Sequence, residues 1–148
     1  MPQLFPTFPE LTIYTDASTV QDNDYKPSYS FDFASGDFLL DGAGRMRLSD
    51  GEAAWKQWCI KALCTQRGAY AAYDEGYGVA VEEAMREPTR GAQKSHLERT
   101  ITEALMAHPR TSAVRDFEYA DGIDGIQTTF TVIGKNDSQI RLAANFTA

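Results

Sequence analysis

Hydrophobic and polar residues alternate along the last third of the chain. The alternation is clearest over residues 126–133 and continues over 139–146, and a third apolar segment lies at 114–119. Such a period of two is typical of strands that bury one face. Turns rich in glycine and aspartate, at 121–125 and 134–137, separate the three segments. The pattern predicts a three-stranded antiparallel sheet joined by short turns.

The middle of the chain carries a different period, with apolar residues every three to four positions. This spacing predicts two main helices, at about 52–65 and 92–107, and a shorter one at about 79–85. A segment rich in glycine and tyrosine, 65–78, separates the first helix from the short one and reads as an ordered loop whose tyrosine rings pack together. The stripes of the two main helices comprise Trp55, Trp58, Cys59, Ala62 and Leu63, and Leu97, Ile101, Ala104 and Leu105.

Short strands separated by glycine turns precede the helices. The segments 29–33, 38–40 and 45–48 predict a small meander. The order of strands, helices and strands favours an α+β fold. We therefore expect small antiparallel sheets, an N-terminal meander and a C-terminal sheet of three strands, packed with two main helices.

Residues 1–28 differ from the rest, because prolines and polar residues interrupt them. They predict an extended N-terminal arm in front of a single α+β domain at 29–148. Within the arm, 11–14 is the one strand-like piece. The arm also holds Phe5 and Phe8, large apolar residues that a disordered tail rarely needs. Two interpretations stay open: the arm lies on a partner, or it packs on its own domain.

Composition narrows the class of protein. The chain has 148 residues, 43% of them hydrophobic, which is enough for one compact core. Its net charge of −7 disfavours binding to nucleic acid, which requires clustered lysine and arginine. We find neither an apolar run that could span a membrane nor a secretory signal. Cys59 and Cys64 are expected to be reduced.

No motif in the sequence predicts catalysis. Phosphate-binding loops and the Gly-x-Ser-x-Gly motif of hydrolases do not occur, and two thiols with two distant histidines do not make a zinc site. We therefore expect no enzyme, no cofactor and no metal. Acidic residues are plentiful, so a lysozyme-like (muralytic) hydrolase of a tail remains the alternative, since glycosidases use paired carboxylates. The candidate carboxylates are Asp74, Glu75, Glu82, Glu83, Asp121 and Asp124.

From residue 29 onward a series of motifs follows in a fixed order: Tyr29-Ser30-Phe31-Asp32-Phe33, Gly36-Asp37-Phe38, the helix with Trp58 and Leu63, Thr65, Tyr73-Asp74-Glu75-Gly76-Tyr77-Gly78, Ile101 to Leu105, and Ala107-His108-Pro109-Arg110. In the order and spacing of these motifs the chain resembles the baseplate proteins of PBSX-like prophage tails, which belong with the wedge and sheath-initiator proteins of T4-type contractile tails. The wider family carries a Glu-Pro-Arg signature after its second helix, and here His108 replaces the glutamate.

The resemblance implies a structural role in the virion tail baseplate, in a particle assembled in the host cytoplasm. Members of the family form rings around the tail tube, usually of six copies. They join the baseplate wedge to the first sheath ring, and their C-terminal sheet accepts sheath strands by edge pairing. The implied partners are the tail sheath protein, baseplate wedge proteins, and tail tube or hub proteins.

The resemblance implies two sets of candidate interface residues, and the apolar residues of the arm are a third candidate set. Pro109 ends the second helix and fixes how the chain leaves it, and Arg110 could bind carboxylates or carbonyl groups of a neighbour. An intradomain salt bridge is the alternative for Arg110. The C-terminal strands supply the sheet for edge pairing, and the aromatic residues of the arm could contact a partner. The strand and arm candidates are Ile126, Thr128, Phe130, Val132, Ile140, Leu142, Phe5 and Phe8.

Overall fold

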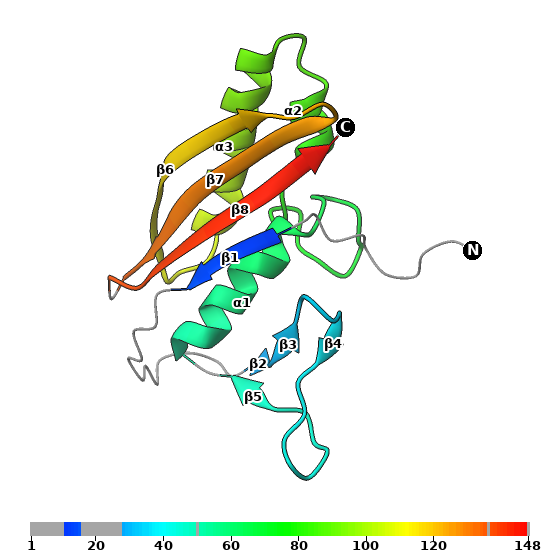
Figure 1. Ribbon diagram of the computed structural model, residues 1–148, viewed down its shortest axis with the longest axis vertical. Coiled ribbons are helices and arrows are strands. Elements are labelled where there is room, and N and C mark those ends of the chain that lie inside the picture. Colours follow the sequence, from blue (N-terminus) through cyan, green and yellow to red (C-terminus); the bar gives the residue numbers. More distant parts are fainter. Residues whose placement is uncertain (1–10, 16–27, 50, 136, 148) are drawn as a thin grey trace, which may run out of the picture. The chain divides into compact units, whose positions relative to one another are not determined.

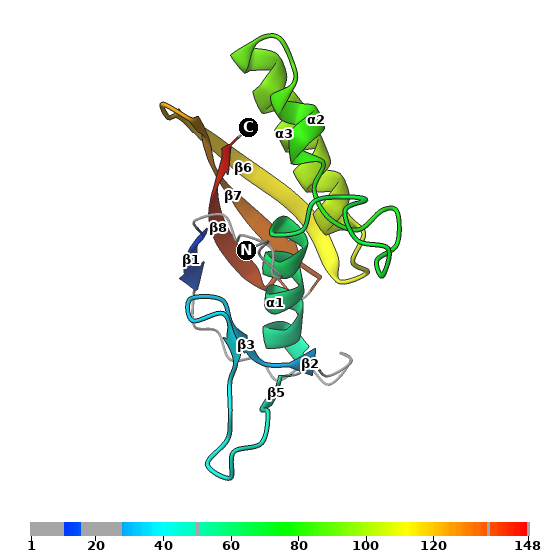
Figure 2. The same ribbon diagram turned by 90° about the vertical axis from the view of Figure 1, so that its right-hand side faces the viewer.

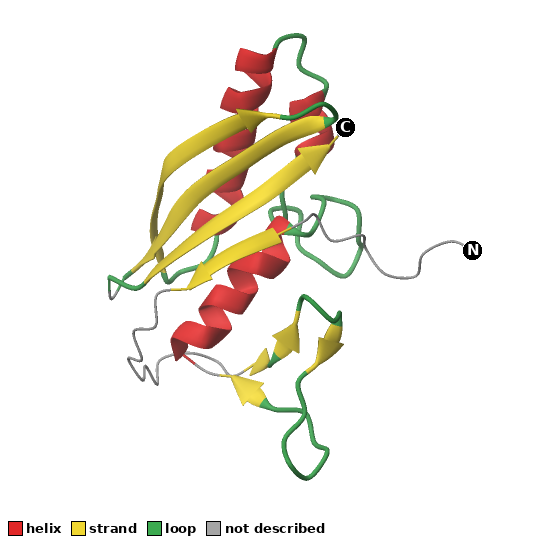
Figure 3. Ribbon diagram, in the orientation of Figure 1, coloured by secondary structure: helices red, strands yellow, loops and turns green. Residues whose placement is uncertain are grey.

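The computed structural model describes residues 11–15, 28–49, 51–135 and 137–147. Its contacts divide the chain into two units, one comprising residues 1–16 and 61–148 and the other residues 17–60. Figure 3 shows the mixture of helices and strands, which confirms the α+β class. Each unit is described by itself.

The first unit contains a four-stranded antiparallel sheet. Its strands are β1 (Leu11–Thr15), β6 (Thr111–Asp121), β7 (Gly125–Gly134) and β8 (Gln139–Thr147), in the order β1-β8-β7-β6 (Figure 1). The three C-terminal strands lie where the alternation predicted them. The strand-like piece of the N-terminal segment is also a strand, and it adds a fourth member that the sequence did not place in this sheet.

Alternation in β7 produces the buried face of the sheet. Ile126, Thr128, Phe130 and Val132 are fully buried, whereas Gln127 between them is exposed. The apolar residues of β8 alternate in the same way over most of its length. Because successive side chains of a strand point to opposite faces, these residues share one side of the sheet.

Helix α3 (Arg90–Met106) covers one face of this sheet, with the shorter α2 (Val81–Met85) beside it (Figure 2). The helix begins at Arg90 rather than near residue 92, because Thr89 caps it: the Thr89 hydroxyl accepts a hydrogen bond from the backbone of Ala92 at 3.2 Å. The predicted stripe is confirmed, since its four residues are all buried: Leu97, Ile101, Ala104 and Leu105.

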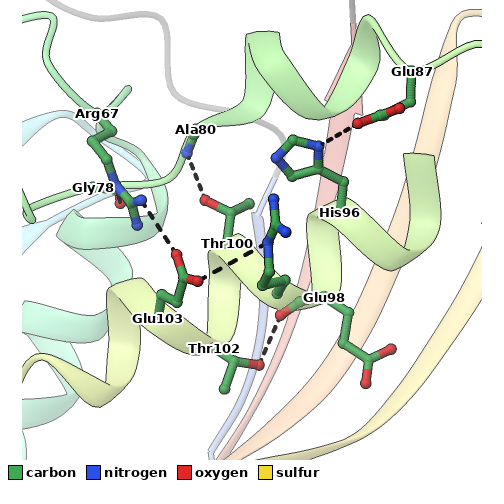
Figure 4. A network of polar contacts seen from close by, with 10 residues as sticks. Arg67, Gly78, Ala80, Glu87, His96, Glu98, Thr100, Thr102 and Glu103 are labelled. Carbon is green, nitrogen blue, oxygen red and sulfur yellow. Dashed lines mark hydrogen bonds and ion pairs between the residues drawn. The ribbon is translucent and has the colours of Figure 1, made fainter. Parts of the chain in front are cut away.

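Polar side chains of α3 fix the segment that precedes α2 (Figure 4). The buried Thr100 hydroxyl accepts a hydrogen bond from the Ala80 backbone at 2.9 Å. Arg67 Nε donates to the Gly78 carbonyl at 3.2 Å, and Arg67 Nη1 lies 3.4 Å from Glu103 of α3. These contacts attach both ends of the loop after the first helix to α3.

That loop is ordered, as the sequence predicted. Gln66 and Val79 form a parallel bridge at its base. Above the bridge, the Tyr73 ring lies 6.1 Å from the ring of Tyr70 and 4.6 Å from that of Tyr77. Ring packing of this kind stabilises a segment that has no regular secondary structure of its own.

The second unit consists of a small meander and most of helix α1 (Gly51–Leu63), which crosses the boundary between the units. The meander contains β2 (Ser28–Tyr29), β3 (Phe31–Asp32), β4 (Asp37–Phe38) and β5 (Leu48–Ser49), shorter than the predicted segments. The Gln57 side chain attaches the meander to α1: its Nε2 donates to the Tyr29 carbonyl at 2.6 Å, and its Oε1 accepts from the Phe31 backbone at 3.0 Å.

Candidate interaction surfaces

The two edges of the four-stranded sheet differ in their suitability for strand pairing. The β6 edge is irregular, with register shifts between Thr111 and Ala113 and between Arg115 and Glu118. Asp116, in the second irregular stretch, has a φ of 60°, a conformation rare for a non-glycine residue. Bulges and charged side chains are devices that discourage another strand from joining an edge. The β6 edge is therefore protected.

The opposite side of the sheet has already accepted a strand from a distant part of the chain. β1 pairs antiparallel with β8 in a regular register that runs from Leu11 opposite Ala144 to Thr15 opposite Ile140 (Figure 1). On its other side, β8 pairs with β7 over nine residues without a register shift. Because the β1–β8 ladder has no irregularity in the described residues, this side is the better template for backbone pairing.

The residues predicted as a strand interface lie in β7 and β8, and their side chains are buried in the core. β7 is paired on both sides, by β6 and β8, so its backbone is not an edge. The edge strands of the sheet are β1, which is paired with β8, and β6. Any edge contact therefore has to involve the side of the sheet formed by β8 and β1, or else β6. Phe5 and Phe8 lie outside the described residues. The six predicted strand residues all have buried side chains: Ile126, Thr128, Phe130, Val132, Ile140 and Leu142.

Pro109 and Arg110 lie in the connection between α3 and β6. Pro109 is exposed, whereas Arg110 is only 4% exposed. The Arg110 carbonyl accepts a hydrogen bond from Lys135, which joins this connection to the turn between β7 and β8. The Arg110 backbone N–H donates to Nδ1 of His108 at 3.2 Å. Arg110 is thus buried, and its backbone is joined to the β7–β8 turn, while its role at an interface and the alternative of an intradomain salt bridge both stay predictions.

Burial, and after it the positive charge of Arg110, lower the pKa of His108 below its usual value of 6.5. The native protein thus favours the neutral imidazole, whose Nδ1 can accept the Arg110 hydrogen bond. The unfolded chain has no such bias and binds the proton more readily. We expect this contribution to stability to be fully present above about pH 6.5 and to be lost as the pH falls from there through the lowered native pKa.

Urea titrations at pH 7 and pH 5.5 on the wild type and on His108→Gln test this expectation. The wild type should lose more free energy of unfolding between the two pH values than the variant does. His96, the other histidine, is present in both proteins and cancels in the comparison. Equal losses would show that His108 is not responsible.

The meander of the second unit presents an apolar face to solvent. Tyr29 lies opposite Leu48, and Leu40 opposite Met46, while the ring of Phe38 lies 6.4 Å from that of Tyr29. Opposed residues of antiparallel strands share a face, and so do alternate residues of one strand. The five residues therefore form one surface, called here the apolar face. Their exposed fractions range from 45% for Phe38 to 65% for Leu48.

The sequence did not reveal this surface. Alternation at 29–33 predicted a half-buried strand, but Tyr29 is 50% exposed. A usable signal was the number of large apolar residues in a segment too short to bury them all. Exposed apolar residues that cluster on a soluble domain mark a site of interaction with another molecule.

The six candidate carboxylates belong to exposed residues of the first unit. A pocket of about 300 Å³ between the α2–α3 connection and the β6–β7 turn has one carboxylate in its lining, that of Asp124. A glycosidase needs two. Among the described residues, no three His, Cys, Asp or Glu side chains group as metal ligands would, and no helix is long and apolar enough to cross a membrane. All six candidates are exposed: Asp74, Glu75, Glu82, Glu83, Asp121 and Asp124.

Comparison with known proteins identifies the family. The model of the contractile injection system sheath initiator family matches residues 27–137, well over half of the chain. This chain belongs to that family. The sheath initiator is also 32% identical over 107 residues to the phage-like element PBSX protein XkdS of Bacillus subtilis (strain 168), a match that covers 71% of this chain and 72% of the relative. The resemblance to PBSX-like tail proteins noted in the sequence is thereby confirmed, and the chain is a phage tail structural protein of the sheath-initiator type.

Proposed function

We propose that this sheath initiator joins the baseplate wedge to the first sheath ring of a contractile tail, and that it starts the sheath by pairing a sheath strand along the β8 side of its sheet. The observation that carries the proposal is the β1–β8 ladder. It supports the idea that this side of the sheet accepts an antiparallel strand from outside the three consecutive strands β6, β7 and β8. Backbone pairing of this kind provides affinity, and alternate side chains provide specificity.

The apolar face supplies a second contact, which we assign to the wedge. It belongs to a different unit from the sheet, so the two partners bind separate parts of the chain. An adaptor between baseplate and sheath requires two such surfaces. In the assembled tail, six copies surround the tube, in contact with tube or hub proteins as well. The role is structural and involves no catalysis, cofactor, nucleic acid or membrane, and assembly takes place in the host cytoplasm before the particle is released.

Pull-down experiments with the purified tail sheath protein and wedge proteins of the same particle test both contacts. The double variant Leu40→Ser/Leu48→Ser should lose wedge binding at least tenfold and keep sheath binding. Ile123→Ser is the matched control, because Ile123 is a 99% exposed apolar residue of the β6–β7 turn, which belongs to the first unit and is not part of the apolar face. Sheath binding that disappears together with wedge binding would contradict the assignment of separate surfaces. Wild-type protein that binds neither partner would refute the adaptor function.

A further inference from the structure

The sheath strand of the proposed function and β1 both use the β8 side of the sheet. A strand that joins the β8 side must pair either with the outer edge of β1 or with β8 itself in place of β1. Pairing with β8 itself puts the sheath strand at the position that β1 now occupies, opposite Ile140 to Ala144. The two modes differ in whether β1 has to leave.

We propose that β1 is a displaceable strand that occupies the sheath-binding site until the sheath arrives. On this proposal, which rests on the function proposed above, a terminal strand of the tail sheath protein replaces β1. The incoming strand then pairs antiparallel with β8. In the free protein, β1 protects an edge that would otherwise be a template for unwanted pairing.

Two features of the described residues favour exchange over addition. β1 is short, five residues against nine in β8 and ten in β7. It joins the sheet from the far end of the sequence, so its departure leaves the hairpins that connect β6, β7 and β8 intact.

The sequence of β1, Leu-Thr-Ile-Tyr-Thr, indicates which segment can replace it. It is rich in β-branched and aromatic residues, carries no charge, and alternates leucine and isoleucine with threonine and tyrosine. We expect the sheath strand that takes its place to show a similar alternation over at least five residues. Displacement of a short end strand is a local opening, which requires much less free energy than global unfolding.

A reversible cross-link between β1 and β8 tests the exchange in the full chain. Thr12 lies opposite Ala143, and opposed residues have Cβ atoms about 4.5–5.5 Å apart, close enough for a disulfide after a small adjustment. Thr12→Cys/Ala143→Cys, once oxidised, holds β1 in place, and a reducing agent releases it. The native cysteines interfere little, because burial raises the pKa of Cys59 and raises that of Cys64 to about 12, so both stay protonated thiols.

The readout is binding to the purified tail sheath protein, with the cross-link verified by mass spectrometry. We expect the reduced variant to bind like the wild type and the oxidised variant to bind at least tenfold more weakly. Thr12→Cys/Gln139→Cys is the matched control: Gln139 lies four residues from Ala143 along β8, about 13 Å away, so no disulfide forms and oxidation should change nothing.

The other outcomes separate this proposal from the function on which it rests. Equal binding by the oxidised and reduced forms would overturn the exchange and leave the adaptor function intact, with the sheath strand paired elsewhere. If no form binds sheath, wild type included, the proposed function fails and the exchange fails with it. A disulfide-linked dimer would place β1 on β8 of a second copy of this chain, and this would overturn the sheath protein as the occupant.

Discussion

Replacing Phe130 with alanine is expected to lower the free energy of unfolding by about 3–5 kcal/mol, the usual cost of removing a fully buried aromatic side chain. Phe130 is fully buried on β7, an inner strand of the sheet, and its ring stacks on Phe117 of β6 with centroids 5.3 Å apart. The cavity left behind cannot close readily, because β6 and β8 hold β7 on both sides. Domains of this size are typically stable by about 5–15 kcal/mol, so the variant would be close to unfolding.

Urea denaturation followed by circular dichroism measures this loss. Gln127→Ala is the control on the same strand: its side chain is exposed, and its effect should stay within about 0.5 kcal/mol. A loss below about 1 kcal/mol for Phe130→Ala would mean that β7 does not present this residue to the core, because surface substitutions cost that little.

The second large loss of stability is expected from a substitution in the loop before α2. Gly78 has a φ of 93°, and a Cβ at this position would lie 2.6 Å from the backbone oxygen of Thr65. That oxygen accepts the hydrogen bond from Val79 which closes the base of the loop at 2.9 Å. Gly78→Ala should therefore cost at least about 1–3 kcal/mol of backbone strain, and relief of the contact would break this hydrogen bond as well.

Gly76→Ala provides the comparison, because a Cβ there meets nothing within 4 Å. Alanine at Gly76 should be neutral or should stabilise the protein by up to about 1 kcal/mol through the unfolded state. Thermal melts of both variants beside the wild type decide the matter. Similar melting temperatures for the two variants would show that the bridge at the base of the loop does not constrain Gly78.

Local patterns were sufficient to predict most elements of this fold. The C-terminal strands and the two main helices could be found because side-chain periods of two and 3.6 depend only on neighbours in the sequence. The start of α3 was placed late because Pro88 and Gly91 suggested a break, whereas Thr89, which lies between them, caps the helix. Capping depends on one side chain, and its signal is weaker than a stripe of several residues.

The pairing of β1 with β8 could not be predicted from local patterns. The segment at 11–14 was recognisable as a strand, but its partner lies at the other end of the chain, and periodicity does not specify which edge a strand joins. The apolar face was missed for a related reason, since the exposure of Tyr29 and Leu48 depends on how short the paired strands are. Burial of Arg110 likewise depends on contacts that are distant in sequence.

Removal of β8 would not be a valid test of the proposed sheath contact. A chain ended after Gly134 would lack all of β8 and with it the partner of both β7 and β1. Loss of binding by such a truncation would report a broken sheet and would say nothing about the edge. Changes confined to β1, such as the cross-link to β8, avoid this ambiguity.

Deletion of the gene for this sheath initiator from the genome that encodes the particle is the most direct test of whether this chain starts the sheath. Electron microscopy of the particles should show baseplates and tail tubes without sheath, and expression of the chain from a plasmid should restore sheathed tails. Sheathed, contractile tails of normal abundance in the deletion strain would contradict the proposed function, because the sheath would then start without this chain.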